Sequence, residues 1–162
     1  MNRKIKIVLL VLGCVIIQTS ILAHFSFFGS KISLPLALTI SIALLRGSLY
    51  GELVGFFSGL LSDLSSGSPF IGVQAFSLTL IGYFIGLMQK RFYSENIVTQ
   101  LLSGFSATIA DKIITMLILG ALLSSYAFPK FRLRGLLLIV IINPILTIIV
   151  YRFSVRIFKG EN

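Results

Sequence analysis

Long apolar runs separated by short polar turns extend along nearly the whole of this chain. A helix needs about 20 apolar residues to cross about 30 Å of hydrocarbon, and six runs reach or approach that length. The runs lack the alternation of apolar and polar residues that marks the strands of a membrane barrel, so we expect helices. They cover approximately residues 5–23, 32–45, 49–64, 70–88, 98–123 and 135–153. The pattern predicts an all-α bundle of about six transmembrane helices, in a single integral membrane domain over residues 1–162.

Two features of these runs depart from a regular span. The second and third runs are short, with a tight turn expected at Arg46, Gly47 and Ser48, so a re-entrant pair is an alternative to two full crossings. In the sixth run, Asn143 precedes Pro144. Proline lacks a backbone donor and disfavours a helical residue before it, so we expect a loosened or kinked helix there.

The N-terminal run has an alternative interpretation as a cleaved signal. The sequence "MNRKIK" before an apolar run is typical of a secretory signal, and "VLGC", which ends at Cys14, resembles a lipoprotein cleavage box. The apolar run continues past Cys14 to a length of about 19 residues, which suits a full span better than the shorter apolar core of a signal. We therefore expect this run to be retained as a helix.

The composition favours a membrane protein over a soluble one. Hydrophobic residues make up 56% of 162 positions, charged residues only 12%, and the mean hydropathy is +1.01. A soluble domain has about 25% charged residues because it must present a wetted surface. This chain has too few charges to cover such a surface.

The distribution of basic residues predicts the orientation. Six spans place both termini on one side, where nine Lys and Arg residues fall, against four on the other side. Because Lys and Arg are enriched in cytoplasmic loops, we expect both termini in the cytoplasm. The net charge of +9 then reflects topology and contact with anionic membrane lipid. No basic soluble module indicates nucleic-acid binding.

Glycine recurs every fourth residue in the segment "RGSLYGELVGFFSGLLSDLSSGSPFIGVQAF", residues 46–76. Small residues four apart allow close approach of helix backbones in lipid. We expect this face, with Gly82 and Gly86 of the next run, to pack inside the bundle or against a partner protein. On a helix, seven small or polar residues of this segment fall within one arc, and bulky apolar residues lie opposite. The arc consists of Gly51, Glu52, Gly55, Ser58, Gly59, Ser62 and Asp63.

Four ionisable residues fall within the expected spans: Glu52, Asp63, Asp111 and Lys112. A charge at the centre of a span costs about 2.5–3.5 kcal/mol, so such residues face water, a partner or the bundle interior. We expect Asp111 to face the interior and Lys112 to lie at the edge of that face. Adjacent residues on a helix do not face each other, so we expect Glu52 or Asp63, rather than Asp111, to pair with Lys112. A proton or ion path is the alternative to a structural role.

Reactive groups are scarce. The chain has one histidine, His24, and one cysteine, Cys14, so neither a Cys–His pair nor a zinc site can be assembled convincingly. No phosphate-binding G-x-x-x-x-G-K-[ST] segment is present. We therefore expect neither an enzyme nor a bound cofactor or metal.

Residues 44–86, "LLRGSLYGELVGFFSGLLSDLSSGSPFIGVQAFSLTLIGYFIG", resemble the central signature of the rod shape-determining protein MreD family. That signature has an Arg-Gly turn, a "G-x-x-x-G-F-x-x-G-L-x-x-D" helix, a Gly/Pro turn and an aromatic span that ends near "G-Y-x-x-G". The resemblance covers about a quarter of the chain and assigns no role to Glu52 or Lys112. The matching positions are Arg46, Gly47, Gly51, Gly55, Phe56, Gly59, Leu60, Asp63, Gly67, Pro69, Gly72, Gly82, Tyr83 and Gly86.

This resemblance implies a non-catalytic, multi-pass component of the bacterial inner membrane, needed for rod shape and lateral peptidoglycan synthesis. It implies association with a bitopic MreC-like protein, and through it with an MreB-like cytoskeleton, a RodA-like glycosyltransferase and a penicillin-binding transpeptidase. A free helix face and the outer loop "SSYAFPKFRLRG" are the surfaces expected to meet the bitopic partner.

The resemblance also suggests an alternative function. The family is similar in fold to the substrate-capture subunits of energy-coupling-factor transporters, which are six-helix bundles. The alternative is therefore a vitamin-type capture subunit or a proton-coupled carrier, with its site near Glu52, Asp63 and Asp111.

Overall fold

The computed structural model describes residues 3–22, 26–27, 30–67, 70–89, 96–122 and 133–158. Within this part of the chain, six helices lie at the six apolar runs, which confirms the all-α fold class. A short antiparallel hairpin pairs Ser26 with Lys31. The elements are α1 (Arg3–Ile17), the π-helix η1 (Gln18–Leu22), β1 (Ser26–Phe27), β2 (Ser30–Lys31), α2 (Leu34–Arg46), α3 (Ser48–Ser66), α4 (Val73–Met88), α5 (Ile97–Leu122) and α6 (Leu133–Phe158).

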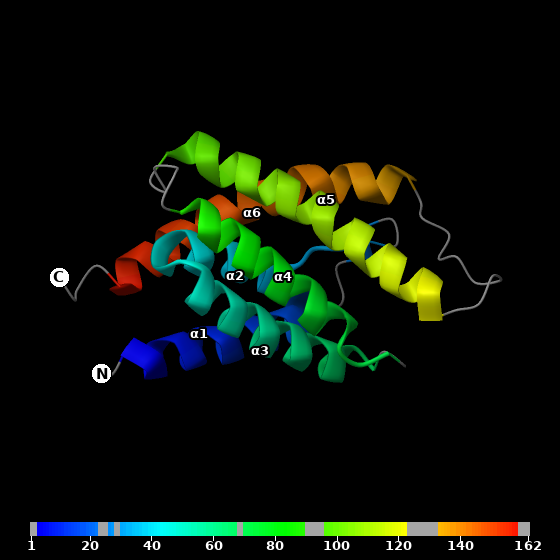
Figure 1. Cartoon of the computed structure of the whole chain (residues 1–162), viewed down its shortest axis with the longest axis horizontal. Coiled ribbons are helices and arrows are strands. Elements are labelled where there is room, and N and C mark those ends of the chain that lie inside the picture. The colour runs from blue at the N-terminus through cyan, green and yellow to red at the C-terminus, as the bar shows by residue number, and fades with distance from the viewer. Residues whose placement is uncertain are drawn as a thin grey trace.

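Helix α2 lies at the centre of the bundle. It contacts all five other helices, and every residue from Pro35 to Leu44 is buried. Figure 1 shows α2 and α4 between a pair formed by α1 and α3 and a pair formed by α5 and α6. A helix that is apolar on all sides is expected to be buried on all sides. The sequence of α2 therefore explains its central position.

A single glycine joins α2 to α3. Gly47 has a φ of +87°, in the left-handed region that glycine adopts without strain, and this confirms the predicted tight turn. The Gln89 side-chain amide donates to the carbonyl oxygen of Leu45 at 3.2 Å. The Arg46 guanidinium lies 5.0 Å from the ring centre of Phe158, within the range of a cation–π contact. The turn is thus held against the ends of α4 and α6.

Hydroxyl groups on the buried helix faces bond to their own helices. Thr39, Ser41 and Thr108 donate to carbonyl oxygens four residues earlier, at 2.8, 2.7 and 2.7 Å. Such bonds satisfy a hydroxyl where water is absent. These residues are therefore compatible with a closed, dry interior.

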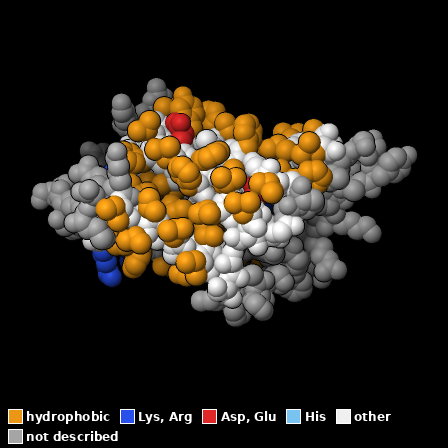
Figure 2. Space-filling view, turned by 90° about the horizontal axis from the view of Figure 1, so that it is seen from below, with side chains coloured by type: hydrophobic (Ala, Val, Ile, Leu, Met, Phe, Trp, Pro, Cys, Tyr) orange, Lys and Arg blue, Asp and Glu red, His pale blue; other side chains and the backbone are white. Residues whose placement is uncertain are grey.

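The outer surface of the bundle is strongly apolar. Among the residues that the structure describes, two helical segments are long and apolar enough to cross a membrane: Ile97–Leu122, with a mean hydropathy of 1.6, and Leu137–Phe158, with 2.1. Only 17% and 33% of their most apolar windows are buried, whereas the core helix of a soluble protein would be largely covered. Figure 2 shows one face of the molecule, on which hydrophobic side chains predominate. Three shorter apolar helices cover Ile7–Ser20, Leu34–Arg46 and Val73–Met88.

Candidate functional site: the glycine seam and the buried acids

Helices α3 and α4 pack backbone against backbone. A Cβ atom added to Gly51 would lie 2.5 Å from the carbonyl oxygen of Gly82, well inside the 3.4–4 Å of ordinary contact. One added to Gly55 would overlap the carbonyl oxygen of Leu78, and Gly59 is enclosed in the same way by backbone atoms of α4. Each glycine therefore permits an approach that no side chain would allow.

Both helices contribute to this contact. Gly86 meets the backbone of Ser48, as Gly82 meets that of Gly51. We call the five residues of the contact the glycine seam: Gly51, Gly55, Gly59, Gly82 and Gly86. The seam lies inside the bundle, so it leaves no room for a partner helix between α3 and α4.

The two serines of the same arc differ in burial. Ser58 is fully buried, and its Oγ lies 3.4 Å from Thr39 Oγ1 on α2 and donates to the carbonyl oxygen of Gly55 at 3.4 Å. Ser62 is half-buried. The opposite arc is not uniformly exposed, because Val54 is only 2% exposed and packs with residues of α1 and α2. Helix α3 therefore buries one edge of its bulky side as well as its small side.

Asp63 caps helix α4 from the end of α3. Its Oδ2 accepts backbone N–H groups of Gly72, Gln74 and Ala75 at 2.8, 3.0 and 3.3 Å, and the residue is only 6% exposed. The first turn of a helix has unpaired N–H groups and the positive end of the helix dipole, and Gly72 at the N-cap has no side chain to supply an acceptor. The expectation that Asp63 pairs with Lys112 is therefore wrong.

Asp111 is the centre of a second polar group, between α4 and α5. Its Oδ1 accepts from Ser77 Oγ at 2.8 Å and from Gln74 Nε2 at 3.3 Å. Asp111 is 1% exposed, which confirms that it faces the interior. Lys112, which is 30% exposed, donates from Nζ to Asp111 Oδ2 at 3.2 Å. The prediction that these neighbours would not pair is wrong, because the long lysine stem lets the ammonium turn back to the carboxylate.

The structure brings two of the three acids together. Gln74 donates its backbone N–H to Asp63 and its side-chain amide to Asp111. Glu52 is half-buried, and its side chain makes no hydrogen bond or ion pair with any residue that the structure describes. It lies eleven residues before Asp63 on α3, about 16 Å along the helix axis. One ligand site formed by all three acids is therefore not present.

Asn143 and Pro144 lie at a junction between helices. Asn143 is 2% exposed, and its Oδ1 accepts the backbone N–H of Ser33 at 3.4 Å. A Cβ added to Gly104 of α5 would lie 2.8 Å from Pro144 Cα, so α5 and α6 are in close contact here. Helix α6 continues through Pro144, and a kink at this position stays a prediction.

Three glutamines have structural roles that the sequence analysis missed. Gln18 donates to the carbonyl oxygen of Ile32 at 2.8 Å and accepts the N–H of Leu34 at 2.9 Å, which ties η1 to the start of α2. Gln74 and Gln89 join helices as described above. A glutamine within an apolar run indicates a bond to another part of the chain, because a buried amide without a hydrogen-bond partner is costly.

Two expected features cannot be placed. His24 and most of the outer loop at 124–135 lie outside the described residues. Within the described ranges, no group of three or more His, Cys, Asp or Glu residues could hold a metal ion.

Comparison with known proteins identifies the family of this chain. No curated protein and no solved structure matches this chain. The chain does match the family described as rod shape-determining protein MreD, over residues 2–157. Because this match covers nearly the whole chain, and not only the signature at residues 44–86, the protein belongs to the rod shape-determining protein MreD family.

Proposed function

We propose that this protein is a multi-pass scaffold of the bacterial cytoplasmic membrane, needed for rod shape and lateral peptidoglycan synthesis. The family match over residues 2–157 carries the proposal, since members are non-catalytic shape-determining proteins. The scaffold associates with an MreC-like bitopic protein, and through it with an MreB-like cytoskeleton, a RodA-like glycosyltransferase and a penicillin-binding transpeptidase.

Three features support the proposed position in the membrane. Apolar side chains cover the exposed faces of the long helices. The start of α1 and the end of α6 lie at the same end of the bundle (Figure 1). Arg46 belongs to this end, because it contacts Phe158, and Arg152 and Arg156 lie in the last two turns of α6. An excess of basic residues at the end that holds both termini favours a cytoplasmic location for that end.

The buried acids favour a scaffold over a carrier. A carrier needs polar groups that are free to receive a ligand or a proton. Asp63 already accepts three backbone N–H groups, and Asp111 accepts from Ser77, Gln74 and Lys112. Both carboxylates are thus engaged in holding α3, α4 and α5 together.

Co-purification from native membranes in a mild detergent, with partners identified by mass spectrometry, tests the proposal directly. Recovery of an MreC-like protein together with wall synthases is the expected result. Recovery of an ATPase with its membrane coupling subunit would replace the scaffold with the transport function.

A substitution in the glycine seam tests the link to cell shape. Gly55→Leu places a large side chain against the α4 backbone and is expected to abolish rod shape in a complementation assay. Leu64→Phe is the matched control, because Leu64 is 57% exposed on the same helix and the added bulk meets no neighbouring helix. Normal rods with a normal level of the Gly55→Leu protein would contradict the assigned role of the seam.

A further inference from the structure

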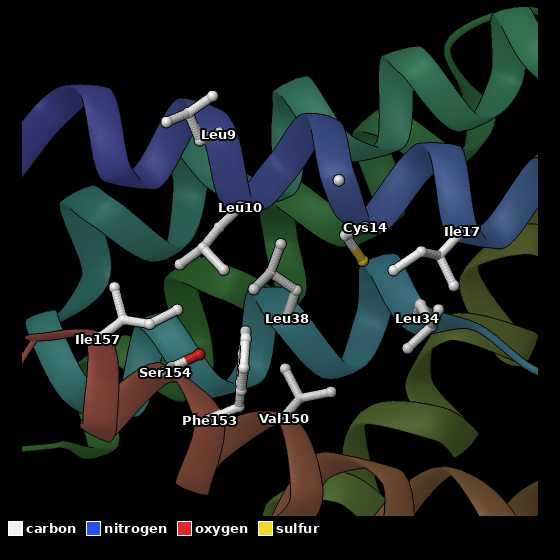
Figure 3. A pocket seen from close by; sticks show the side chains of 11 residues that line it. Leu9, Leu10, Cys14, Ile17, Leu34, Leu38, Val150, Phe153, Ser154 and Ile157 are labelled. Atoms are coloured by element: carbon white, nitrogen blue, oxygen red, sulfur yellow. The ribbon is translucent and has the colours of Figure 1, made fainter.

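An apolar groove separates the first and last helices. Helix α1 packs on α2 and α3, and a groove of about 510 Å³ lies between α1 and α6. Helix α2 forms its floor through Leu34 and Leu38 (Figure 3). The volume falls in the range of about 300–1,000 Å³ that small-molecule sites occupy.

A glycine widens this groove, although no close packing between helices requires a glycine at that position. Gly13 lines the wall on α1, and a Cβ added to it would meet no atom within 4 Å. The helical glycines of the seam and Gly104 behave differently, because each of them would meet a neighbouring backbone. The missing side chain at position 13 therefore leaves room for something other than this chain.

Water does not suit the groove. A buried water makes about three hydrogen bonds to polar groups. Ser154 supplies the one hydroxyl of the lining, while the other lining residues are apolar or the thiol Cys14. The Ser154 Oγ is itself buried without a hydrogen-bond partner in the described structure. A space with so few polar groups is filled by hydrocarbon when the protein is in a membrane.

The length of the groove distinguishes between two hydrocarbon occupants. On α1 it runs from Leu9 to Ile17, about 12 Å at 1.5 Å per residue. A partner transmembrane helix needs a surface as long as the hydrocarbon core, about 30 Å. A groove of about 12 Å matches one leaflet. The groove also lies towards the basic end of the bundle. Leu34 is the floor residue farthest from Arg46, and it is only twelve residues away, about 18 Å along α2.

Two arginines, Arg156 and Arg46, lie near that end of the groove. Arg156 is exposed and precedes Ile157, which lines the groove. Arg46 lies over the ring of Phe158, the next residue after Ile157. Such a cluster complements an anionic phosphate head group.

We propose that this groove binds an acyl chain of an anionic glycerophospholipid from the cytoplasmic leaflet, with the phosphate at the basic end. The inference rests on the proposed membrane orientation, and it does not depend on the proposed partners. Binding of this kind fills the gap between α1 and α6 and ties the two terminal helices together through a lipid.

Photo-crosslinking in nanodiscs tests the proposal. The full chain is placed in equimolar phosphatidylglycerol and phosphatidylcholine, with a trace of one or the other lipid carrying a diazirine in its acyl chain. Crosslinks from the phosphatidylglycerol probe are expected to concentrate on residues 9–17 and 150–157. Arg156→Gln is expected to reduce the preference for phosphatidylglycerol about fivefold, the factor for about 1 kcal/mol per basic residue.

A pair of neighbouring substitutions provides the control. Gly13→Phe fills the groove and is expected to reduce crosslinking there to the level of the general lipid-facing surface. Leu12→Phe adds a similar ring one residue away, in the second groove between α1 and α3, and is expected to leave the signal unchanged. The open space beside Gly13 makes Gly13→Phe compatible with folding, which its thermal unfolding verifies.

Three outcomes would overturn the proposal. They are crosslinks spread evenly over the exposed helices, a signal in Gly13→Phe equal to that of the wild type, and equal labelling by both lipids. Crosslinks between two copies of the chain at these residues would identify the groove as a self-association surface instead. The nanodiscs contain no partner protein, so failure of the scaffold proposal would leave a positive lipid result intact.

Discussion

Alanine at two glycines of this chain should change stability in opposite directions. Gly13 and Gly55 both lie inside helices, in α1 and α3. A Cβ at Gly13 would meet nothing within 4 Å, whereas one at Gly55 would overlap the carbonyl oxygen of Leu78. The same chemical change therefore separates helix propensity from helix packing.

The expected magnitudes follow from these surroundings. Alanine is favoured over glycine within a helix by about 0.8–1.0 kcal/mol, so Gly13→Ala should stabilise the protein by about 1 kcal/mol. At Gly55 the same gain is opposed by overpacking, which costs about 1–3 kcal/mol. The upper part of that range applies because the obstructing atom belongs to the α4 backbone and cannot rotate away. Gly55→Ala should thus destabilise the protein by about 2 kcal/mol.

Unfolding in mixed micelles measures both free energies. The purified variants are titrated with dodecyl sulfate in a mild detergent, and helix content is followed by circular dichroism. In thermal scans, about 1 kcal/mol corresponds to a shift of about 2–4 °C for a chain of this size. The midpoint should rise for Gly13→Ala and fall by about twice as much for Gly55→Ala.

Equal effects of the two substitutions would refute the reasoning. If both stabilise the protein, α3 and α4 do not approach as closely as the geometry of the seam requires. If both destabilise it, the space beside Gly13 is filled by another part of the chain. The sign of the stability change at each position therefore decides whether the packing described for these two glycines is correct.

Three further predictions concern other contacts. Asp63→Ala should destabilise the protein by about 3 kcal/mol, because three N–H groups lose a charged acceptor. Asp63→Asn retains an oxygen and should cost about 1 kcal/mol in the same titration. Equal losses of stability would show that Asp63 does not act as a helix cap. Lys112→Met should lower the stability by about 3–5 kcal/mol, because it leaves Asp111 buried without its cation. Adding Asp111→Asn should recover most of the lost stability. No recovery in the double variant would show that loss of the ion pair is not the cause. Gly47→Ala should lower the thermal midpoint through a left-handed strain of about 1–2 kcal/mol, and an unchanged midpoint would show that the turn adopts another conformation.

The sequence predicted the helices and the small face of α3 for a clear physical reason. Apolar runs of this length form helices wherever backbone groups must be satisfied internally. The spacing of Gly51, Gly55 and Gly59 predicted close packing, and the contacts with α4 account for it. The lack of a polar face on α2 also accounts for its central position, which the helix-by-helix pattern alone did not predict.

The partners of the polar residues were not predictable from one helix at a time. Asp63 caps a helix that begins ten residues later, and this contact depends on where the end of α3 lies relative to the start of α4. The Asp111–Lys112 pair depends on a lysine rotamer, which helical spacing does not specify. Glutamine side chains such as Gln18 meet their partners only once the helices are assembled.

The burial of α2 has a consequence for how the protein is built. Its 13 residues extend about 20 Å, less than the hydrocarbon thickness of about 30 Å, and a short helix alone in lipid requires local thinning or association. In the proposed membrane setting, helix α2 is therefore stable only when other helices surround it. Synthesis delivers α2 second, but the helices that complete its enclosure, α5 and α6, emerge last. The bundle thus gains its stability late and as a unit, and a fragment that ends after α4 should be degraded rather than accumulate as a partial bundle.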